Sequence, residues 1–127
     1  MAEAVIDASA LLALLNSEPG ADIVAEALPG AVISAVNLSE VVAKLSETGM
    51  PEKAIRQALQ PLGLEVIPFD DEQAYQAGIL RAATQDTGVS LGDRSCLSLA
   101  KMLGVVALTA DKAWARLSIG ATIRVIR

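Results

Sequence analysis

The sequence contains no histidine and a single cysteine, Cys96. Without imidazole the chain cannot build a Ser-His-Asp or Cys-His catalytic arrangement, and one thiol supports neither an intrachain disulfide nor a multi-thiolate zinc site. Cys96 lies on the apolar stripe of an expected helix, so we interpret it as a small buried hydrophobic residue. The cysteine usage is typical of a protein in the reducing cytoplasm. Hard oxygen atoms are the metal ligands that remain.

Aromatic residues and positive charge are also scarce. The only aromatic residues are Phe69, Tyr75 and Trp114, too few for a base-stacking platform, and we expect Trp114 to be a packing anchor. The net charge of −5 disfavours a non-specific nucleic-acid coat, although an enzyme could still contact nucleic acid through a local basic rim. No apolar run approaches the roughly 18 residues that a membrane span needs, so we expect no membrane association.

Apolar residues, in contrast, make up 53% of the 127 residues. This content predicts one well-packed domain over residues 1–127. Short apolar runs alternate with helical patterns along the whole chain. The expected strands cover 4–6, 31–33, 64–67, 105–109 and 122–126, and the expected helices cover 10–15, 21–28, 37–48, 51–60, 70–86 and 93–103. Strands separated by helices predict an α/β fold, with a mostly parallel sheet of four to five strands in a three-layer α/β/α arrangement.

Four acidic residues stand at notable places in this pattern. Asp7 and Asp111 follow expected strands, Asp93 opens an expected helix, and Glu40 lies one turn after Asn37. Taken singly, each aspartate could be a helix cap, and Glu40 could pair with Lys44 on the surface. Taken together, the aspartates occupy the edges that line the ligand crevice of a parallel sheet. The sequence therefore predicts an acidic cluster.

Such a cluster has a chemical consequence. Carboxylates gathered in one place repel each other, by about 1 kcal/mol per pair at about 4 Å in bulk water and by more in a cleft. Unless protons or basic side chains offset this repulsion, the cluster implies a cation. Mg²⁺ and Mn²⁺ prefer carboxylate and water oxygens, polarise phosphoryl oxygens and lower the pKa of a water ligand.

The acidic residues lie in four short stretches that resemble known motifs. These stretches are similar, in order and spacing, to the motifs of PIN-domain ribonucleases, most of all the VapC toxins of bacterial toxin–antitoxin pairs. They are Asp7-Ala8-Ser9, Val36-Asn37-Leu38-Ser39-Glu40-Val41, Leu91-Gly92-Asp93-Arg94-Ser95-Cys96-Leu97 and Leu108-Thr109-Ala110-Asp111-Lys112-Ala113-Trp114. Each motif alone is weak, but four in order span nearly the whole chain.

The resemblance implies an endoribonuclease that requires Mg²⁺ or Mn²⁺ and cleaves RNA with a water activated by the metal. It implies that the acidic set is Asp7, Glu40, Asp93 and Asp111, of which the three aspartates are the expected metal ligands. It also implies supporting roles for Ser9, Asn37 and Thr109, although all three could instead be turn or cap residues. A homodimer and a VapB-type antitoxin whose tail enters the crevice are the expected partners.

The basic residues near the acids are candidates for contacts with RNA phosphates. Arg94, Lys112 and Arg116 could steer a polyanion toward an otherwise repulsive site. Alternatively, they neutralise the acidic cluster or form surface ion pairs.

Other functions remain open from the sequence. An aspartate-nucleophile phosphatase would carry D-x-D after the first strand, where this chain has Ser9 in the third position. A phosphoacceptor receiver would need paired acids near the N-terminus, which Glu3 and Asp7 do not supply. A non-catalytic PIN-like binding module is the alternative from a different class, and a complete acidic set argues against it.

Overall fold

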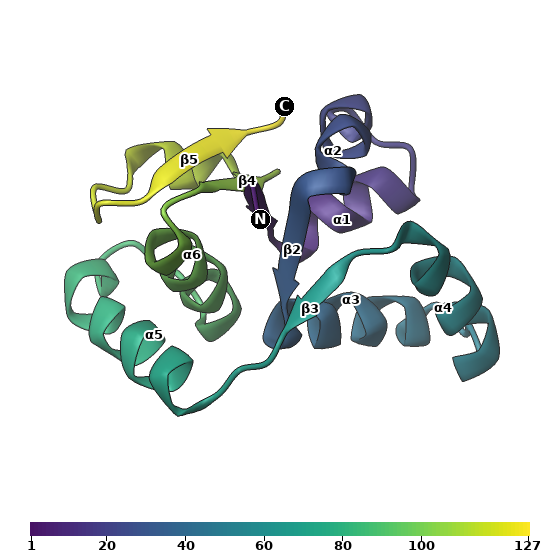
Figure 1. Ribbon diagram of the computed structural model, residues 1–127, viewed down its shortest axis with the longest axis horizontal. Helices are drawn as coiled ribbons and strands as arrows, with labels where there is room; N and C mark the ends of the chain where they lie inside the picture. The colour runs from purple at the N-terminus through teal and green to yellow at the C-terminus, as the bar shows by residue number, and fades with distance from the viewer.

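The computed structural model describes residues 1–127 and contains five strands, six α-helices and three short 3-10 helices (Figure 1). The strands are β1 (Ala4–Ile6), β2 (Ala31–Ser34), β3 (Glu65–Ile67), β4 (Val106–Thr109) and β5 (Thr122–Val125). The helices are α1 (Ala8–Leu15), α2 (Ala21–Ala27), α3 (Ala35–Glu47), α4 (Glu52–Leu59), α5 (Asp71–Thr84) and α6 (Leu91–Leu103). The 3-10 helices are η1 (Leu28–Gly30), η2 (Gln60–Leu62) and η3 (Lys112–Arg116).

All five strands form one parallel sheet with the order β3-β2-β1-β4-β5. The central strand is β1, whose Val5 pairs with Val32 of β2 and with Ala107 of β4. The strand order reverses at β1, because the chain adds β2 and β3 on one side and β4 and β5 on the other. The carboxyl ends of β1 and β4 therefore lie side by side at the switch point, where open parallel sheets place their ligands. The expected fold class is confirmed.

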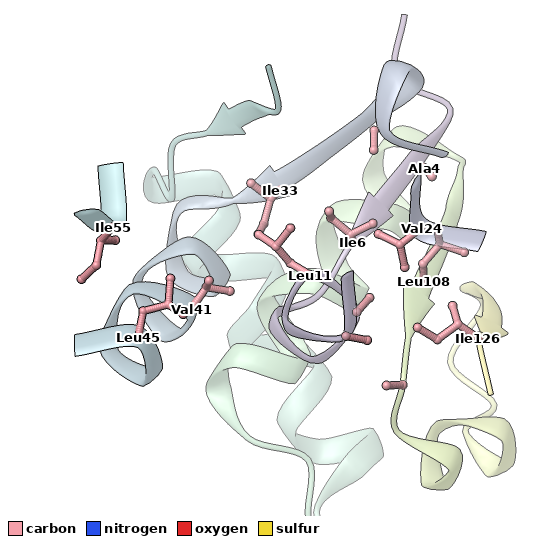
Figure 2. Close-up of a cluster of buried hydrophobic side chains, with 14 residues drawn as sticks. Ala4, Ile6, Leu11, Val24, Ile33, Val41, Leu45, Ile55, Leu108 and Ile126 are labelled. Atoms are coloured by element: carbon pink, nitrogen blue, oxygen red, sulfur yellow. The ribbon is translucent and has the colours of Figure 1, made fainter. Parts of the chain in front are cut away.

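The sheet separates two hydrophobic cores. Alternate residues of a strand point to opposite faces, so Ala4 and Ile6 enter one core and Val5 enters the other. The first core, shown in Figure 2, lies beneath α1 to α4 and includes Leu11 and Val41. The second is covered by α6 and α5, which lie together on the other side of the sheet (Figure 1). Both cores come together around β1, which is fully buried and fixes its carboxyl end.

Several helices begin at capping residues that also set the position of the pocket described below. Ser34 caps α3 by accepting a hydrogen bond from the Val36 amide, so α3 begins two residues before the start expected from the apolar pattern. A capping box between Ser90 and Asp93 opens α6, which ends at Gly104 as expected.

The apolar pattern of α6 was only partly correct. Leu103, expected on the buried stripe, is 44% exposed, whereas Leu97 is fully buried. Since α6 packs against α5 as well as against β1, β2 and β4, most of its circumference is buried, which explains the burial of Leu97; the exposed Leu103 is the last residue of the helix. Cys96 and Trp114 are buried as expected. No helix combines the length and the apolar character that a membrane crossing requires.

Candidate active site

The four predicted acids line one open pocket of about 390 Å³. The end of β1 supplies Asp7, the end of β4 leads into Asp111, α3 carries Glu40, and the first turn of α6 carries Asp93. The complete lining consists of Asp7, Ala8, Ser9, Leu12, Asn37, Glu40, Ala43, Lys44, Glu47, Asp93 and Asp111. The fold thus brings residues 7 and 111, which are far apart in the sequence, to one edge of the sheet.

Asp7 is the buried acid of this pocket, with only 4% of its surface exposed. Its carboxylate accepts hydrogen bonds from the Thr109 hydroxyl (2.6 Å), the Ser9 hydroxyl (2.8 Å) and the Ala10 amide (2.8 Å). Burial raises the pKa of Asp7 to about 6, because desolvation outweighs these three hydrogen bonds, and the nearby Asp93 adds to the increase. Asp7 is therefore both the cap of α1 and a carboxylate whose ionised form is destabilised by burial.

Ser9 and Thr109 connect Asp7 to the backbone after β4. The Ser9 oxygen accepts a hydrogen bond from the Ala110 amide (2.9 Å), and the Thr109 oxygen accepts one from the Asp111 amide (3.0 Å). The two hydroxyl oxygens are 3.2 Å apart. Asp7, Ser9, Thr109 and Asp111 form what we call the strand side of the pocket.

Glu40 occupies the opposite side, where α3 meets α6. The Asn37 side-chain amide donates to Glu40 Oε1 (2.9 Å) and to the backbone oxygen of Gly92 (3.0 Å). Glu40 is not paired with Lys44, which instead lies 3.9 Å from Glu47. Asn37 is 1% exposed, and its Oδ1 atom has no hydrogen-bond partner. We call Asn37, Glu40, Gly92 and Asp93 the helix side of the pocket.

Asp93 and Asp111 each use one carboxylate oxygen as a cap. Asp93 Oδ2 accepts from the Ser90 amide (2.9 Å), and Asp111 Oδ1 accepts from the Ala113 amide (2.9 Å). The second oxygen of each carboxylate has no hydrogen bond within the protein. Asp93 and Asp111 can therefore each cap a helix with one carboxylate oxygen and offer the other oxygen to the pocket.

The basic residues lie differently from the sequence-based expectation. Arg94 points away from the acids, because its guanidinium donates to the Ala77 backbone oxygen of α5 (3.0 Å). Lys112 and Arg116 are exposed but do not line the pocket. Lys44 does line it and was not among the candidate RNA contacts. Its position one helical turn after Glu40 was the signal that could have identified it.

The donor set fits a hard divalent cation. No three acidic or thiol groups lie close enough together to hold an ion by themselves. Mg²⁺ does not require three protein ligands, because it keeps several waters and is usually bound through one or two carboxylates together with substrate phosphates. Burial and Asp93 raise the pKa of Asp7, and a cation in the pocket would lower it again by favouring the ionised carboxylate. One or two of Asp7, Asp93 and Asp111 could ligate such an ion directly, with water filling the remaining positions.

Comparison with known proteins identifies the family. The model of the PIN domain family matches residues 4–120, most of the chain. The chain belongs to the PIN domain family. The PIN domain is 29% identical over 110 residues to VapC ribonuclease Mb2780c of Mycobacterium bovis and to ribonuclease VapC42 of Mycobacterium tuberculosis, in each case covering 79% of this chain and 84% of the relative. The expected resemblance to VapC proteins is thereby confirmed.

Solved structures agree on the fold of this PIN domain. DNA-bound VapBC from Salmonella typhimurium superposes with a TM-score of 0.77 at 21% identity, and a toxin–antitoxin complex from Klebsiella pneumoniae with a TM-score of 0.76 at 23% identity. Each match covers 98% of both chains. The similarity therefore includes the strands and helices that build the acidic pocket.

Proposed function

We propose that this PIN domain is an endoribonuclease that depends on Mg²⁺ or Mn²⁺. The observation that carries the proposal is the pocket in which the four acids meet, with a buried aspartate whose pKa is raised to about 6. The VapC ribonucleases, to which the chain is 29% identical, support RNA as the substrate.

In this proposal Asp7, Asp93 and Asp111 would hold the divalent cation, one or two of them directly and the others through water. A bound cation would polarise the scissile phosphate and lower the pKa of the attacking water. The Ser9 and Thr109 hydroxyls fix the Asp7 carboxylate in one orientation, since both donate to it. At neutral pH this carboxylate is ionised in spite of its raised pKa, so its negative charge is available to a ligand.

Glu40 and Lys44 have separate roles in this proposal. Glu40 keeps Oε2 free while Oε1 accepts from Asn37, so it can take a proton or orient a water on the helix side. Lys44 places a positive charge at the rim, where it can attract an RNA phosphate. Arg94 is unsuited to that task because its guanidinium is engaged with α5.

We also propose that the chain is the toxin of a toxin–antitoxin pair, working in the cytoplasm as a homodimer that a VapB-type antitoxin inhibits. The solved VapBC complexes support this partner.

An apolar groove of about 510 Å³ between α3 and α4 could receive an amphipathic helix of the antitoxin, and it includes Leu38, Val42, Ile55 and Leu59. Val42→Arg should abolish co-purification of the antitoxin after co-expression and leave RNA cleavage unchanged; an intact complex would refute this groove.

Cleavage of RNA by the purified chain tests the enzymatic proposal. Wild-type protein should cut RNA with Mn²⁺ and not with EDTA, and sequencing of the cut ends should reveal a preferred site. Asp7→Asn and Asp93→Asn should each abolish cleavage while the fold is retained, and the exposed Asp86→Asn provides the matched control. Metal-dependent cleavage that persists in both pocket variants would remove the assignment.

Two alternatives are separated by the same samples. A non-catalytic binding module would show a higher melting temperature with Mn²⁺ but no cleavage, since an ion that binds only the native state stabilises it. An aspartate-nucleophile phosphatase would hydrolyse a phosphomonoester instead of RNA. The position that would carry its second aspartate is Ser9, whose hydroxyl donates to Asp7.

A further inference from the structure

We propose that Gly92 is a positioning residue for Glu40. The absence of a side chain at position 92 creates the space in which the Glu40 carboxylate lies against the first turn of α6, and the Asn37 amide holds it there. This inference rests on the proposed function, because it explains how the helix side of the pocket is assembled.

The space at Gly92 is occupied by the functional end of Glu40. A Cβ atom added to Gly92 would lie 2.5 Å from Glu40 Cδ and would overlap both carboxylate oxygens. Cβ atoms essentially never approach other heavy atoms closer than 3.0 Å. Every residue other than glycine would therefore displace the carboxylate.

The backbone itself does not require glycine at position 92. Gly92 is the second residue of α6 and is not among the residues with positive φ. Glycine inside a helix is less favourable than alanine by about 1 kcal/mol. The contact with Glu40 is thus the feature of the structure that accounts for glycine here.

Asn37 supplies the attraction that complements this space. Both partners of its Nδ2 atom, Glu40 Oε1 and the Gly92 oxygen, are acceptors, so only the amino end of the side chain can face them. One buried amide therefore joins α3 to α6 and fixes the carboxylate between them. The first turn of α6 also favours a nearby negative charge, because the positive end of the helix dipole lies there.

The consequence is a defined arrangement of two acids. Asp93 follows Gly92 directly, so the same turn of α6 carries one pocket carboxylate and receives the other. Gly92 and Asn37 thereby set the separation of Glu40 from Asp93. A purely structural role would instead make Gly92 a close-packing site between two helices, and this difference is measurable.

Gly92→Ala separates the two roles, with Gly78→Ala as the matched control. Gly78 lies in α5 and has nothing within 4 Å of its would-be Cβ, so alanine there should raise the melting temperature without affecting the pocket. Gly92→Ala should retain the fold, since the clash is with the end of a flexible side chain. It should weaken Mn²⁺ binding, measured by calorimetry, by about 10-fold or more, because the displaced Glu40 carboxylate no longer orients a water of the ion on the helix side.

Two further measurements keep the inference falsifiable. When Glu40→Ala is already present, adding Gly92→Ala or Asn37→Ala should not lower the Mn²⁺ affinity further. If either substitution lowers the affinity equally in the wild-type protein and in Glu40→Ala, the inference is overturned. The Asn37 side-chain amide signals in an NMR spectrum of metal-free protein should move in Gly92→Ala and stay unchanged in Gly78→Ala. If those signals do not move, Gly92 does not position Glu40.

The NMR result also separates this inference from the proposed function. It needs no metal and no RNA, so a failure of wild-type protein to cleave RNA would count against the nuclease while the contact between Asn37, Glu40 and Gly92 could still be tested. If Gly92→Ala does not fold, Asn37→Ala alone provides the affinity measurement, and unchanged Mn²⁺ binding in that variant would refute the role of the amide.

Discussion

The two sides of the pocket are built in different ways. On the strand side, Asp7 is buried, and its three hydrogen-bond donors are Ser9 and Ala10 in the first turn of α1 and Thr109 at the end of β4. On the helix side, Glu40 is exposed and is held by one side-chain amide in a space left by a glycine. The strand side is therefore coupled to the stability of the whole sheet, whereas the helix side can change with little effect on folding.

The largest expected effect is the pH dependence of stability that Asp7 causes. Its pKa rises from 3.8 to about 6 on folding, so the protonated form is favoured in the native state. The stability gained from this proton is fully present below about pH 4 and is lost as the pH rises through 6, with an upper limit of about 3 kcal/mol. Urea unfolding in EDTA should show Asp7→Asn gaining on the wild type between pH 4 and 7. A constant difference across this range would contradict the burial of an ionised Asp7.

The next effect in size concerns Thr109. Thr109→Val removes the 2.6 Å hydrogen bond to Asp7 and the acceptor for the Asp111 amide, so we expect a loss of about 1–3 kcal/mol in unfolding free energy. Because that hydrogen bond lowers the pKa of Asp7, the pKa should rise further and Mn²⁺ affinity near pH 6 should fall. Thr84→Val is the control, since the Thr84 hydroxyl is also buried but bonds to Leu80 in α5. Equal Mn²⁺ affinity in both variants would argue against the strand side as the anchor of the site.

Glu40→Gln tests the helix side of the comparison. Glutamine keeps the oxygen that accepts from Asn37, so unfolding free energy should change by no more than about 0.5 kcal/mol, the usual limit for exposed sites. Cleavage should nevertheless fall strongly, because a carboxylate is lost from the pocket. Glu47→Gln, at the rim beside Lys44, is the control and should leave cleavage near the wild-type level. A large loss of stability in Glu40→Gln would show that both sides are coupled to folding.

The smallest expected effect is that of Lys44 at the rim. Lys44→Ala should leave stability unchanged and weaken RNA binding mainly at low salt, reducing the slope of log affinity against log salt by about 1. Comparison with Lys112→Ala decides which lysine contacts phosphate. If only Lys112→Ala changes the slope, the RNA approaches the pocket from η3 and not across α3.

Much of this organisation could be predicted from the sequence. The alternation of apolar strands with helices was sufficient for the parallel sheet, and the aspartates after β1 and β4 could be assigned to one edge because parallel strands end together. Helix caps could also be predicted, because Ser34 is a residue type that favours the start of a helix and Gly104 one that favours its end. The expected boundaries of the helices and strands differ from the observed ones by one or two residues, because the capping residue of a helix and its first apolar residue are at different positions.

The sequence by itself determined the parallel sheet and the acids available at its edge, because strand periodicity, helix signals and the position of a residue after a strand are local properties of the chain. Only the tertiary structure decided that Asp7 is buried with a raised pKa, that Arg94 points to α5, and that Glu40 lies in the space beside Gly92. The physical reason is distance along the chain: Asn37 reaches a backbone oxygen 55 residues away, and Thr109 an acid 102 residues away. Such contacts depend on how the helices and strands pack, and no local pattern of residues encodes them.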